Sequence, residues 1–227
     1  MNVLKMGSGH KINGINCQDA TGQYKDILKV VCDGCSEGIH SEIGAKLFCK
    51  MLVEKYRRFY EMGKKYINVP ELITTVMDEL VNMIGKTPQD IKDYLSFTIL
   101  VMEKIPDTVY SYVYHCGDGY ILYDTGDGVQ FKKLDCGEYP MYLAYNYIPG
   151  DMMKQYKDGV LISTYESESY KNVGVASDGI RFVVERADGD PLKEEFKAIL
   201  NSGKDMKMKL FFNRNENIFQ DDFSIVY

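Results

Sequence analysis

The segment Leu28-Lys29-Val30-Val31-Cys32-Asp33-Gly34 combines the features of a buried strand with those of an abrupt turn. Its first five residues are mostly apolar and include two adjacent valines, a composition typical of a strand that is covered on both faces. Asp33-Gly34 then ends the strand, because glycine lets the backbone turn sharply. A carboxylate in this position projects from the edge of a sheet while the preceding residues stay in the core.

Two further segments of the same kind occur later in the chain. Asp178 follows a predicted strand at 172–176, and Asp221 precedes a predicted strand at 223–227. If these strand ends converge with Asp33, they form an all-oxygen site of the kind that Mg²⁺ or Mn²⁺ prefers. Taken singly, an aspartate in such a position is more often a turn or cap residue.

Helical patterns flank this strand-rich sequence. Apolar residues recur at helical spacing after Ser41, which we expect to cap a helix, and again after Pro70. A third helix is expected from Pro191 with Asp190 as its cap. The basic run 204–209 is expected to form a loop or a strand edge.

The middle of the chain has short strand-like segments separated by Gly, Asp and Pro. These segments lie at 95–103, 108–116, 120–124 and 129–134. Strands so closely spaced are expected to pair antiparallel in a meander. Because helices and strands do not alternate regularly, the pattern predicts the α+β class, with antiparallel sheets covered by helices.

Length and composition limit the classes of protein. A chain of 227 residues without a linker or repeat is expected to form a single domain, 1–227. The net charge of −6 argues against a nucleic-acid partner. No signal-peptide pattern or apolar run long enough to span a membrane is present, so we expect a cytoplasmic monomer with reduced cysteines.

Five aspartate-bearing segments also follow one another in a known order. They are Asn16-Cys17-Gln18-Asp19-Ala20, Val31-Cys32-Asp33-Gly34, Gly117-Asp118-Gly119, Ala176-Ser177-Asp178-Gly179 and Gln220-Asp221-Asp222-Phe223-Ser224-Ile225-Val226. This order resembles the signature motifs of the type-2C (metal-dependent, PPM-type) serine/threonine protein phosphatases, in their bacterial-like branch. Ser96-Phe97-Thr98-Ile99 resembles the threonine-bearing strand of that family. The resemblance extends from about Gly7 to Tyr227.

The resemblance implies a fold and a reaction. The fold would be a four-layer α-β-β-α sandwich of two antiparallel sheets flanked by helices. The reaction would be hydrolysis of phosphoserine and phosphothreonine in proteins by a hydroxide that bridges two Mn²⁺ or Mg²⁺ ions. Asp33 would bridge the ions, the Gly34 carbonyl would bind one of them, and Asp178 and Asp221 would ligate the other.

The resemblance also implies supporting residues and partners. Gln18 and Asp19 would orient metal-bound waters, and Asp118 would lie where some family members hold a third ion. The substrate would be a phosphorylated protein, and a kinase would be the functional partner. No nucleic acid or membrane is expected to take part.

The chain departs from the family pattern at two kinds of residue: the one that grips the phosphate and the one that protonates the leaving group. Gly14 stands where many members have an arginine that grips the phosphate, and Lys11 and His10 are the nearest substitutes. The histidine proposed as the acid for the leaving group in some members is absent. A metal-bound water or His40 would then take that role.

Three hypotheses about function follow from the sequence. Retention of Asp33, Asp178 and Asp221 favours an active phosphatase, which by the same chemistry could also act on small molecules. The missing arginine favours a catalytically silent pseudophosphatase that acts as a binding module. An unrelated divalent-ion-binding protein would explain the aspartates but not their order.

Overall fold

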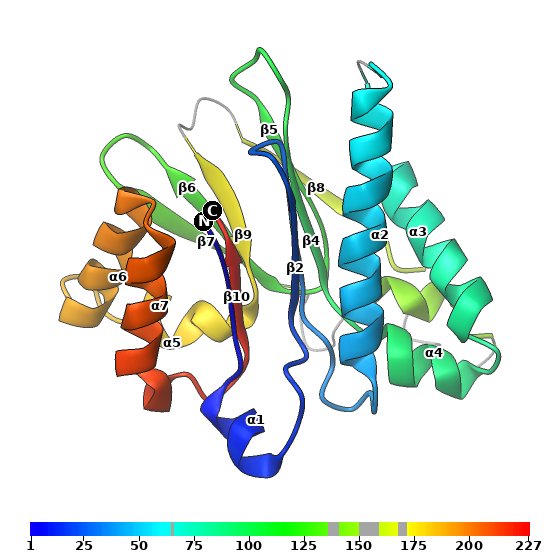
Figure 1. Ribbon diagram of the computed structural model, residues 1–227, viewed down its shortest axis with the longest axis horizontal. Coiled ribbons are helices and arrows are strands. Elements are labelled where there is room, and N and C mark those ends of the chain that lie inside the picture. Colours follow the sequence, from blue (N-terminus) through cyan, green and yellow to red (C-terminus); the bar gives the residue numbers. More distant parts are fainter. Residues whose placement is uncertain (65, 136–140, 150–158, 168–171) are drawn as a thin grey trace.

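The chain folds into two antiparallel sheets that lie face to face, with helices over the outer face of each (Figure 1). The structure, a computed structural model, describes residues 1–64, 66–135, 141–149, 159–167 and 172–227. Each sheet has five strands. The α+β class and the four-layer α-β-β-α sandwich expected from the family resemblance are confirmed.

The first sheet joins the two ends of the chain. Its strand order is β1-β10-β9-β6-β7. In that order the strands are β1 (Asn2–Lys5), β10 (Phe223–Val226), β9 (Val173–Ala176), β6 (Gly119–Asp124) and β7 (Val129–Leu134). Asn2 lies opposite Val226 and Lys5 opposite Phe223, so the first strand of the chain pairs with the last.

The second sheet contains the apolar strand that ends at Asp33. Its order is β2 (Ala20–Tyr24), β3 (Leu28–Cys32), β4 (Ile99–Lys104), β5 (Ser111–Cys116) and β8 (Ser163–Ser167). The prediction for β3 is confirmed, and all five of its residues are buried because both faces of the sheet are covered. Even Lys29 is buried, and its Nζ atom donates to Asn172 Oδ1 (2.9 Å) and to the Val173 carbonyl (2.8 Å) next to the other sheet.

The expected single meander is wrong. β4 and β5 form one hairpin and β6 and β7 another, but the two hairpins belong to different sheets. The chain crosses from one sheet to the other at Gly117, whose φ of 94° is a left-handed conformation that favours glycine. Local spacing predicts that neighbouring strands pair, and it does not show where the chain changes sheets.

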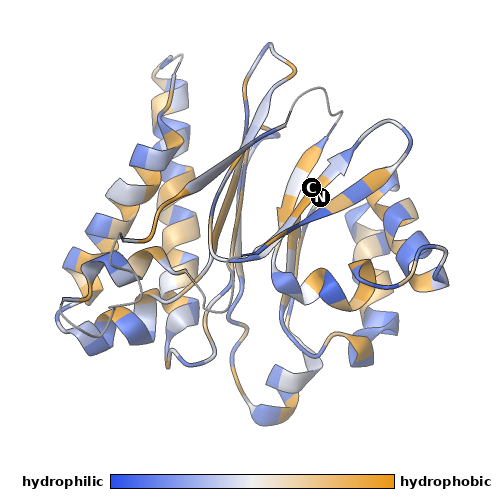
Figure 2. Ribbon diagram, turned by 180° about the vertical axis from the view of Figure 1, so that it is seen from behind, coloured by the Kyte–Doolittle hydropathy of each residue, from blue (hydrophilic) through white to orange (hydrophobic). Residues whose placement is uncertain are grey.

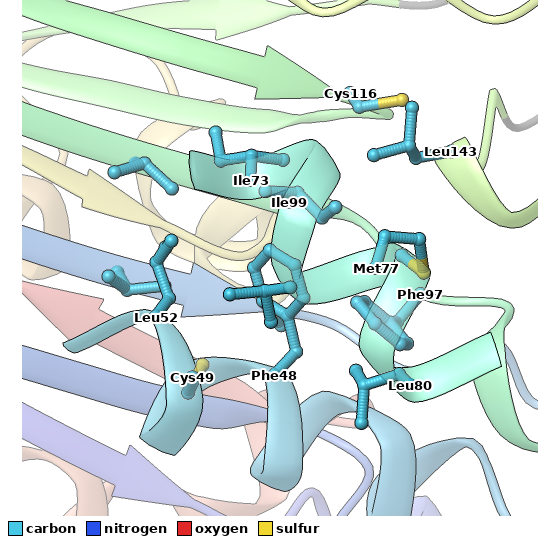
Figure 3. Packing of buried hydrophobic residues seen from close by; sticks show 14 of the residues in the cluster. Phe48, Cys49, Leu52, Ile73, Met77, Leu80, Phe97, Ile99, Cys116 and Leu143 are labelled. Carbon is cyan, nitrogen blue, oxygen red and sulfur yellow. The ribbon is translucent and has the colours of Figure 1, made fainter. Parts of the chain in front are cut away.

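Three helices cover the second sheet. They are α2 (Ser41–Glu61), α3 (Val69–Ile84) and α4 (Pro88–Leu95). Side chains such as Phe48 and Leu52 of α2 and Met77 of α3 pack with Phe97 and with β4 in one buried cluster (Figure 3). Such burial, at about 25 cal/mol per Å² of apolar surface, is the main stabilising contribution to this layer.

Two expectations in this layer are wrong, the start of β4 and the cap of α2. The strand predicted from residue 95 begins at Ile99, because the sequence before it forms α4. A capping box starts that helix, with the Thr87 side chain and the Asp90 side chain each accepting from the backbone N–H of the other residue. Ser41 does not cap α2, since its hydroxyl donates to the Cys35 carbonyl at 2.9 Å.

The helices on the first sheet are α5 (Arg181–Val184), α6 (Pro191–Ser202) and α7 (Asp205–Arg214). The predicted cap of α6 is confirmed, because the Asp190 side chain accepts from the Leu192 and Lys193 backbone amides. The basic run 204–209 lies mostly in α7, so the expectation of a loop or strand edge is wrong. Both helical layers carry hydrophobic and hydrophilic residues, as expected of helices with one face on a sheet (Figure 2).

Between the sheets lies a third apolar cluster, which includes Val31 of β3, Leu100 of β4 and Val226 of β10. The remaining short elements are α1 (Ser8–Asn13) and the 3-10 helices η1 (Leu143–Tyr147), η3 (Asp178–Ile180) and η4 (Glu216–Ile218). Within the ranges described, no helix is long and apolar enough to cross a bilayer.

Candidate functional site

The predicted acidic residues gather at one end of the sandwich. Asp33 follows the last residue of β3, Asp178 lies two residues beyond β9, and Asp221 lies two residues before β10. Because β9 and β10 run antiparallel, the end of one lies beside the start of the other. This is the end at which α1 lies in Figure 1.

Thr98 fixes the backbone of Asp33 from both sides. The Asp33 amide donates to Thr98 Oγ1 at 3.0 Å, and the Thr98 amide donates to the Asp33 carbonyl at 2.8 Å. Although Asp33 keeps some exposed surface, burial of its carboxyl raises the pKa well above the usual range, and the negative charges of Asp19, Asp178 and Asp221 raise it further. The charged form of Asp33 is therefore disfavoured in this place unless a cation lies nearby.

Asp19 is the most enclosed of the group, with 0% of its surface exposed. Ser177 donates its hydroxyl to Asp19 Oδ2 at 2.7 Å. The other oxygen, Oδ1, is buried without a donor among the described residues, and the Asp33 carboxyl lies beside the Asp19 carboxyl. Burial raises the pKa of Asp19 to about 7. The unpaired Oδ1 atom is a site at which an ordered water would satisfy a buried polar group.

Asp178 and Asp118 form the side of the site nearest the first sheet. Burial raises the pKa of Asp178 to about 6, the Arg181 guanidinium opposes this rise, and the charges of Asp221 and Asp118 add to it. Burial also raises the pKa of Asp118, which lies between β5 and β6. Five carboxyl groups that influence one another in a partly enclosed place, those of Asp19, Asp33, Asp118, Asp178 and Asp221, are typical of a functional site.

The adjacent residues Asp221 and Asp222 have different surroundings. The Asp221 side chain is 35% exposed and faces Arg181. The Asp222 side chain is 2% exposed and accepts from the backbone amides of Gly7 (2.8 Å) and Gln18 (2.5 Å). Asp222 therefore ties the segment before α1 and the segment before β2 to the start of β10, and Asp221 is left to face the site.

An arginine outside the signature motifs, Arg181, contacts two of the predicted metal ligands. Arg181 forms an ion pair through Nη1 with Asp178 Oδ2, and its Nη2 lies 3.4 Å from Asp221 Oδ2. It lies three residues after Asp178, where η3 runs into α5, and this i, i+3 spacing is the sequence signal that could have revealed it.

The donor set suits Mn²⁺ or Mg²⁺, although the side chains do not converge on one point. Carboxylate oxygens and the Gly34 carbonyl are the hard ligands that these ions take. The unpaired Asp19 oxygen and the raised pKa values of Asp33 and Asp178 indicate carboxyl groups whose charged forms a bound cation would stabilise. Among the residues described, no three His, Cys, Asp or Glu side chains are arranged to hold a metal ion, and Arg181 lies against two of the candidates.

Gly34 and Gln18 shape the loop beside Asp33. A Cβ atom on Gly34 would lie 2.7 Å from Ser41 Oγ and 2.9 Å from the Gln18 carbonyl, so only glycine fits there without displacement. Gln18 donates through Nε2 to the Cys35 carbonyl and accepts at Oε1 from Ser36. In this arrangement the Gln18 side chain holds the loop that follows Gly34.

The two basic residues expected to contact phosphate lie in different surroundings. Lys11 pairs with Glu216 on an exposed surface. His10 is buried, with Nε2 3.8 Å from Asp221 Oδ1 and Nδ1 2.9 Å from Asp222 Oδ2, an ion-pair distance without the alignment of a hydrogen bond. The structure thus brings His10 to the aspartates but not Lys11.

Gly14 stands where many family members have an arginine, and His40 is a candidate for the acid that protonates the leaving group. The His40 ring packs against the Tyr94 ring at 5.0 Å between centroids. Gly14 ends α1 in a left-handed conformation with φ of 65°, and a Cβ atom there would meet nothing within 4 Å. An arginine at position 14 would therefore have space but an unfavourable backbone.

A cavity of about 650 Å³ lies at the opposite end of the sandwich. It lies between the C-terminal end of α2 and the β4–β5 hairpin, and it is lined by tyrosines and by the buried Glu103, which accepts from the Tyr56 hydroxyl at 2.8 Å. The five aspartates are not part of its lining, so the candidate chemistry is assigned to the acidic end.

We predict that Asp222→Ala lowers the free energy of unfolding by about 2–4 kcal/mol, because two buried backbone N–H groups lose their acceptor. Denaturant-induced unfolding of the metal-free protein measures this loss. Asp221→Ala is the matched control and is expected to cost much less, since its side chain is partly exposed. Equal losses in the two variants would contradict the structural role of Asp222.

Comparison with known proteins agrees with the geometry. Residues 6–211 match the family model described as "Protein phosphatase 2C". No curated protein sequence matches the chain significantly. The matched span includes Asp33, Asp118 and Asp178 and ends before Asp221, which the fold brings beside Asp178.

Solved structures show the same fold at low sequence identity. A crystal structure of a bacterial serine phosphatase aligns with a TM-score of 0.63 and 14% identity, covering 99% of this chain and 95% of that one. The serine/threonine phosphatase PstP/Ppp of Mycobacterium tuberculosis gives 0.62 and 10%, with 99% and 95% covered. The phosphatase Stp1 of Staphylococcus aureus gives 0.60 and 13%, with 99% and 92% covered. With the family model matching most of its length, the chain belongs to the protein phosphatase 2C family.

Proposed function

We propose that this chain is a metal-dependent phosphatase that hydrolyses phosphoserine and phosphothreonine in proteins. The observation that supports this most is the enclosure of Asp19, Asp33 and Asp178 beside one another with raised pKa values. Negative charge concentrated in this way is favourable once a divalent cation neutralises it.

Each residue has a role in this proposal. Asp33, Asp178, Asp221 and the Gly34 carbonyl would hold two Mn²⁺ or Mg²⁺ ions, and Asp118 would hold a third where one binds. When bound, these ions would neutralise the phosphate dianion and lower the pKa of water toward neutrality. Thr98 keeps the Asp33 backbone in place through two hydrogen bonds.

Asp19 and Gln18 would support the ions without contacting them. The free Oδ1 atom of Asp19 is the acceptor we propose for an ordered water, and Ser177 fixes the orientation of the carboxylate. Gln18 holds the loop after Gly34. We further propose that residues 1–227 act as one catalytic domain and as a monomer, opposing a protein kinase.

The test is hydrolysis of an aryl phosphate and of a phosphothreonine peptide, with and without Mn²⁺. In Asp178→Asn the metal-dependent kcat is expected to fall by more than the ~10–100-fold typical of losing an outer-sphere partner. Asp188→Asn is the matched control, because Asp188 is exposed and pairs only with Lys193 among the ion pairs described. A folded wild type that binds Mn²⁺ but hydrolyses neither substrate would contradict the proposal.

The pseudophosphatase remains the second candidate, and the ion pairs of Arg181 are the observation that favours it. A guanidinium on Asp178 and Asp221 supplies positive charge where a metal ion would otherwise bind. Absence of turnover together with absence of Mn²⁺ binding in the folded wild type would select this candidate.

A further inference from the structure

The Arg181 side chain joins two parts of the site that are far apart in sequence. Its Nη1 pairs with Asp178 on η3, and its Nη2 lies 3.4 Å from Asp221, which precedes β10. Each contact uses a different nitrogen and a different carboxylate. The two arms of one guanidinium thus lie across the pair of carboxylates that would ligate a single metal ion.

The other basic groups near this end of the sandwich have other partners. Lys11 pairs with Glu216, Lys133 with Glu185, and His10 lies closest to Asp222. Of the ion pairs described, those with Arg181 are the only ones that reach Asp178. Arg181 is therefore the cationic side chain best placed to meet a ligand bound at these aspartates.

The ion pairs of Arg181 are of a kind that a divalent cation can displace. The side chain of Arg181 is 41% exposed, and those of Asp178 and Asp221 are 20% and 35% exposed. Ion pairs that are open to solvent contribute little to stability. A divalent ion on the same two carboxylates would gain more, because it brings twice the charge and takes oxygen ligands directly.

A displaced guanidinium would remain at the site. Arg181 is the first residue of α5, and its guanidinium lies 5.0 Å from the Phe182 ring, so the backbone keeps it within reach of the aspartates. Its planar fork of N–H donors matches two oxygens of a phosphate group, which lysine cannot match. Metal binding would therefore free the group that a phosphate monoester needs.

We propose that Arg181 has two alternating partners: Asp178 and Asp221 in the metal-free protein, and the phosphate group of the substrate when metal is bound. This inference rests on the proposed function, which supplies the metal and the phosphate. It assigns to position 181 the phosphate grip that position 14 lacks. In Arg181→Gln, loss of the first role should tighten Mn²⁺ binding, and loss of the second role should weaken phosphate binding.

The first measurement is Mn²⁺ affinity of the metal-free protein by isothermal titration calorimetry. Removing the competing ion pairs raises the fraction of molecules whose carboxylates are free to bind metal, so Arg181→Gln is expected to bind Mn²⁺ about two- to fivefold more tightly. Arg186→Gln is the matched control, because Arg186 lies five residues further along and pairs with Asp190 instead. Its Mn²⁺ affinity is expected to equal that of the wild type.

The second measurement is binding of inorganic phosphate to the Mn²⁺-loaded protein. Loss of a charged, forked donor is expected to weaken phosphate binding by about 10–100-fold in Arg181→Gln. Arg181→Lys keeps the charge without the fork and is expected to restore only part of that affinity. Thermal melting of each variant checks that it is folded.

The outcomes separate this inference from the proposed function. Tighter Mn²⁺ binding with weaker phosphate binding supports both roles of Arg181. Unchanged affinities in Arg181→Gln, in a protein whose wild type hydrolyses aryl phosphates, overturn the inference and leave the proposed function in place. No Mn²⁺ binding in wild type or variant overturns both.

Discussion

Asp33→Asn is expected to abolish metal-dependent hydrolysis and, in the same protein without metal, to raise the melting temperature. Hydrolysis should fall by more than ~100-fold, because Asp33 is the carboxylate proposed to contact both ions. Stability should rise because an amide of the same shape removes a carboxylate that lies close to three others.

The pH dependence gives the sign of the stability effect. Asp33 has a raised pKa in the folded chain and a pKa of about 4 in the unfolded chain. Between these values the folded chain holds the proton that the unfolded chain has lost, so the stability due to this residue falls as pH rises. Well below pH 4, the residue is neutral in both states and the substitution should change stability little.

Thermal unfolding at pH 8 in chelator, and again in Mn²⁺, measures both effects. We expect Asp33→Asn to melt about 2–4 °C above wild type in chelator, for a gain of about 1 kcal/mol. Mn²⁺ should stabilise the wild type and leave the variant unchanged. Asp127→Asn, in the exposed β6–β7 turn, is the matched control and should behave as wild type. A lower melting temperature of Asp33→Asn in chelator would contradict the charge argument.

Gly179→Ala is expected to separate Asp178 from Asp221. A Cβ atom on Gly179 would lie 1.8 Å from the Asp222 carbonyl oxygen, so either η3 or the start of β10 must move. Forced overpacking of this kind costs roughly 1–3 kcal/mol. Because the displaced residues carry the site, Mn²⁺ binding and hydrolysis should be lost even in molecules that remain folded.

Gly174→Ala is the matched control for this prediction. Its Cβ atom would lie 2.5 Å from the Val226 carbonyl oxygen. This clash lies between β9 and β10 and away from the aspartates. We expect a similar loss of stability by denaturant unfolding, with hydrolysis per folded molecule retained. If Gly179→Ala hydrolyses substrate as well as Gly174→Ala does, the packing of η3 on β10 does not hold the site together.

Local sequence patterns predicted those parts of the fold that depend on interactions between residues close together in the sequence. The apolar run of β3, the Asp190 cap of α6 and the strand-end positions of Asp33 and Asp178 follow from neighbouring residues alone. The crossing between sheets at Gly117 depends on packing between distant strands, which spacing does not encode. The four-layer arrangement was expected from the family resemblance and not from periodicity.

The candidate site was predictable in its residue types and less so in its contacts. Asp221 and Asp222 are adjacent and chemically identical, and only the fold shows that Asp222 is buried against two backbone amides. Arg181 lies outside the five aspartate-bearing motifs, and it is 40 residues away from Asp221 in the sequence. Such contacts depend on the pairing of β9 with β10.

The pairing of β1 with β10 has a consequence for how the protein is made. Residues 2–5 are translated long before their strand partner at 223–226. The loop between them is long, and closing it is entropically costly and slow. During synthesis β1 and β9 therefore lack the strand between them until β10 has been made, and Asp221 is made just before β10. A chain that still lacks residues 221–226 is therefore expected to lack both the closed sheet and one of the proposed metal ligands.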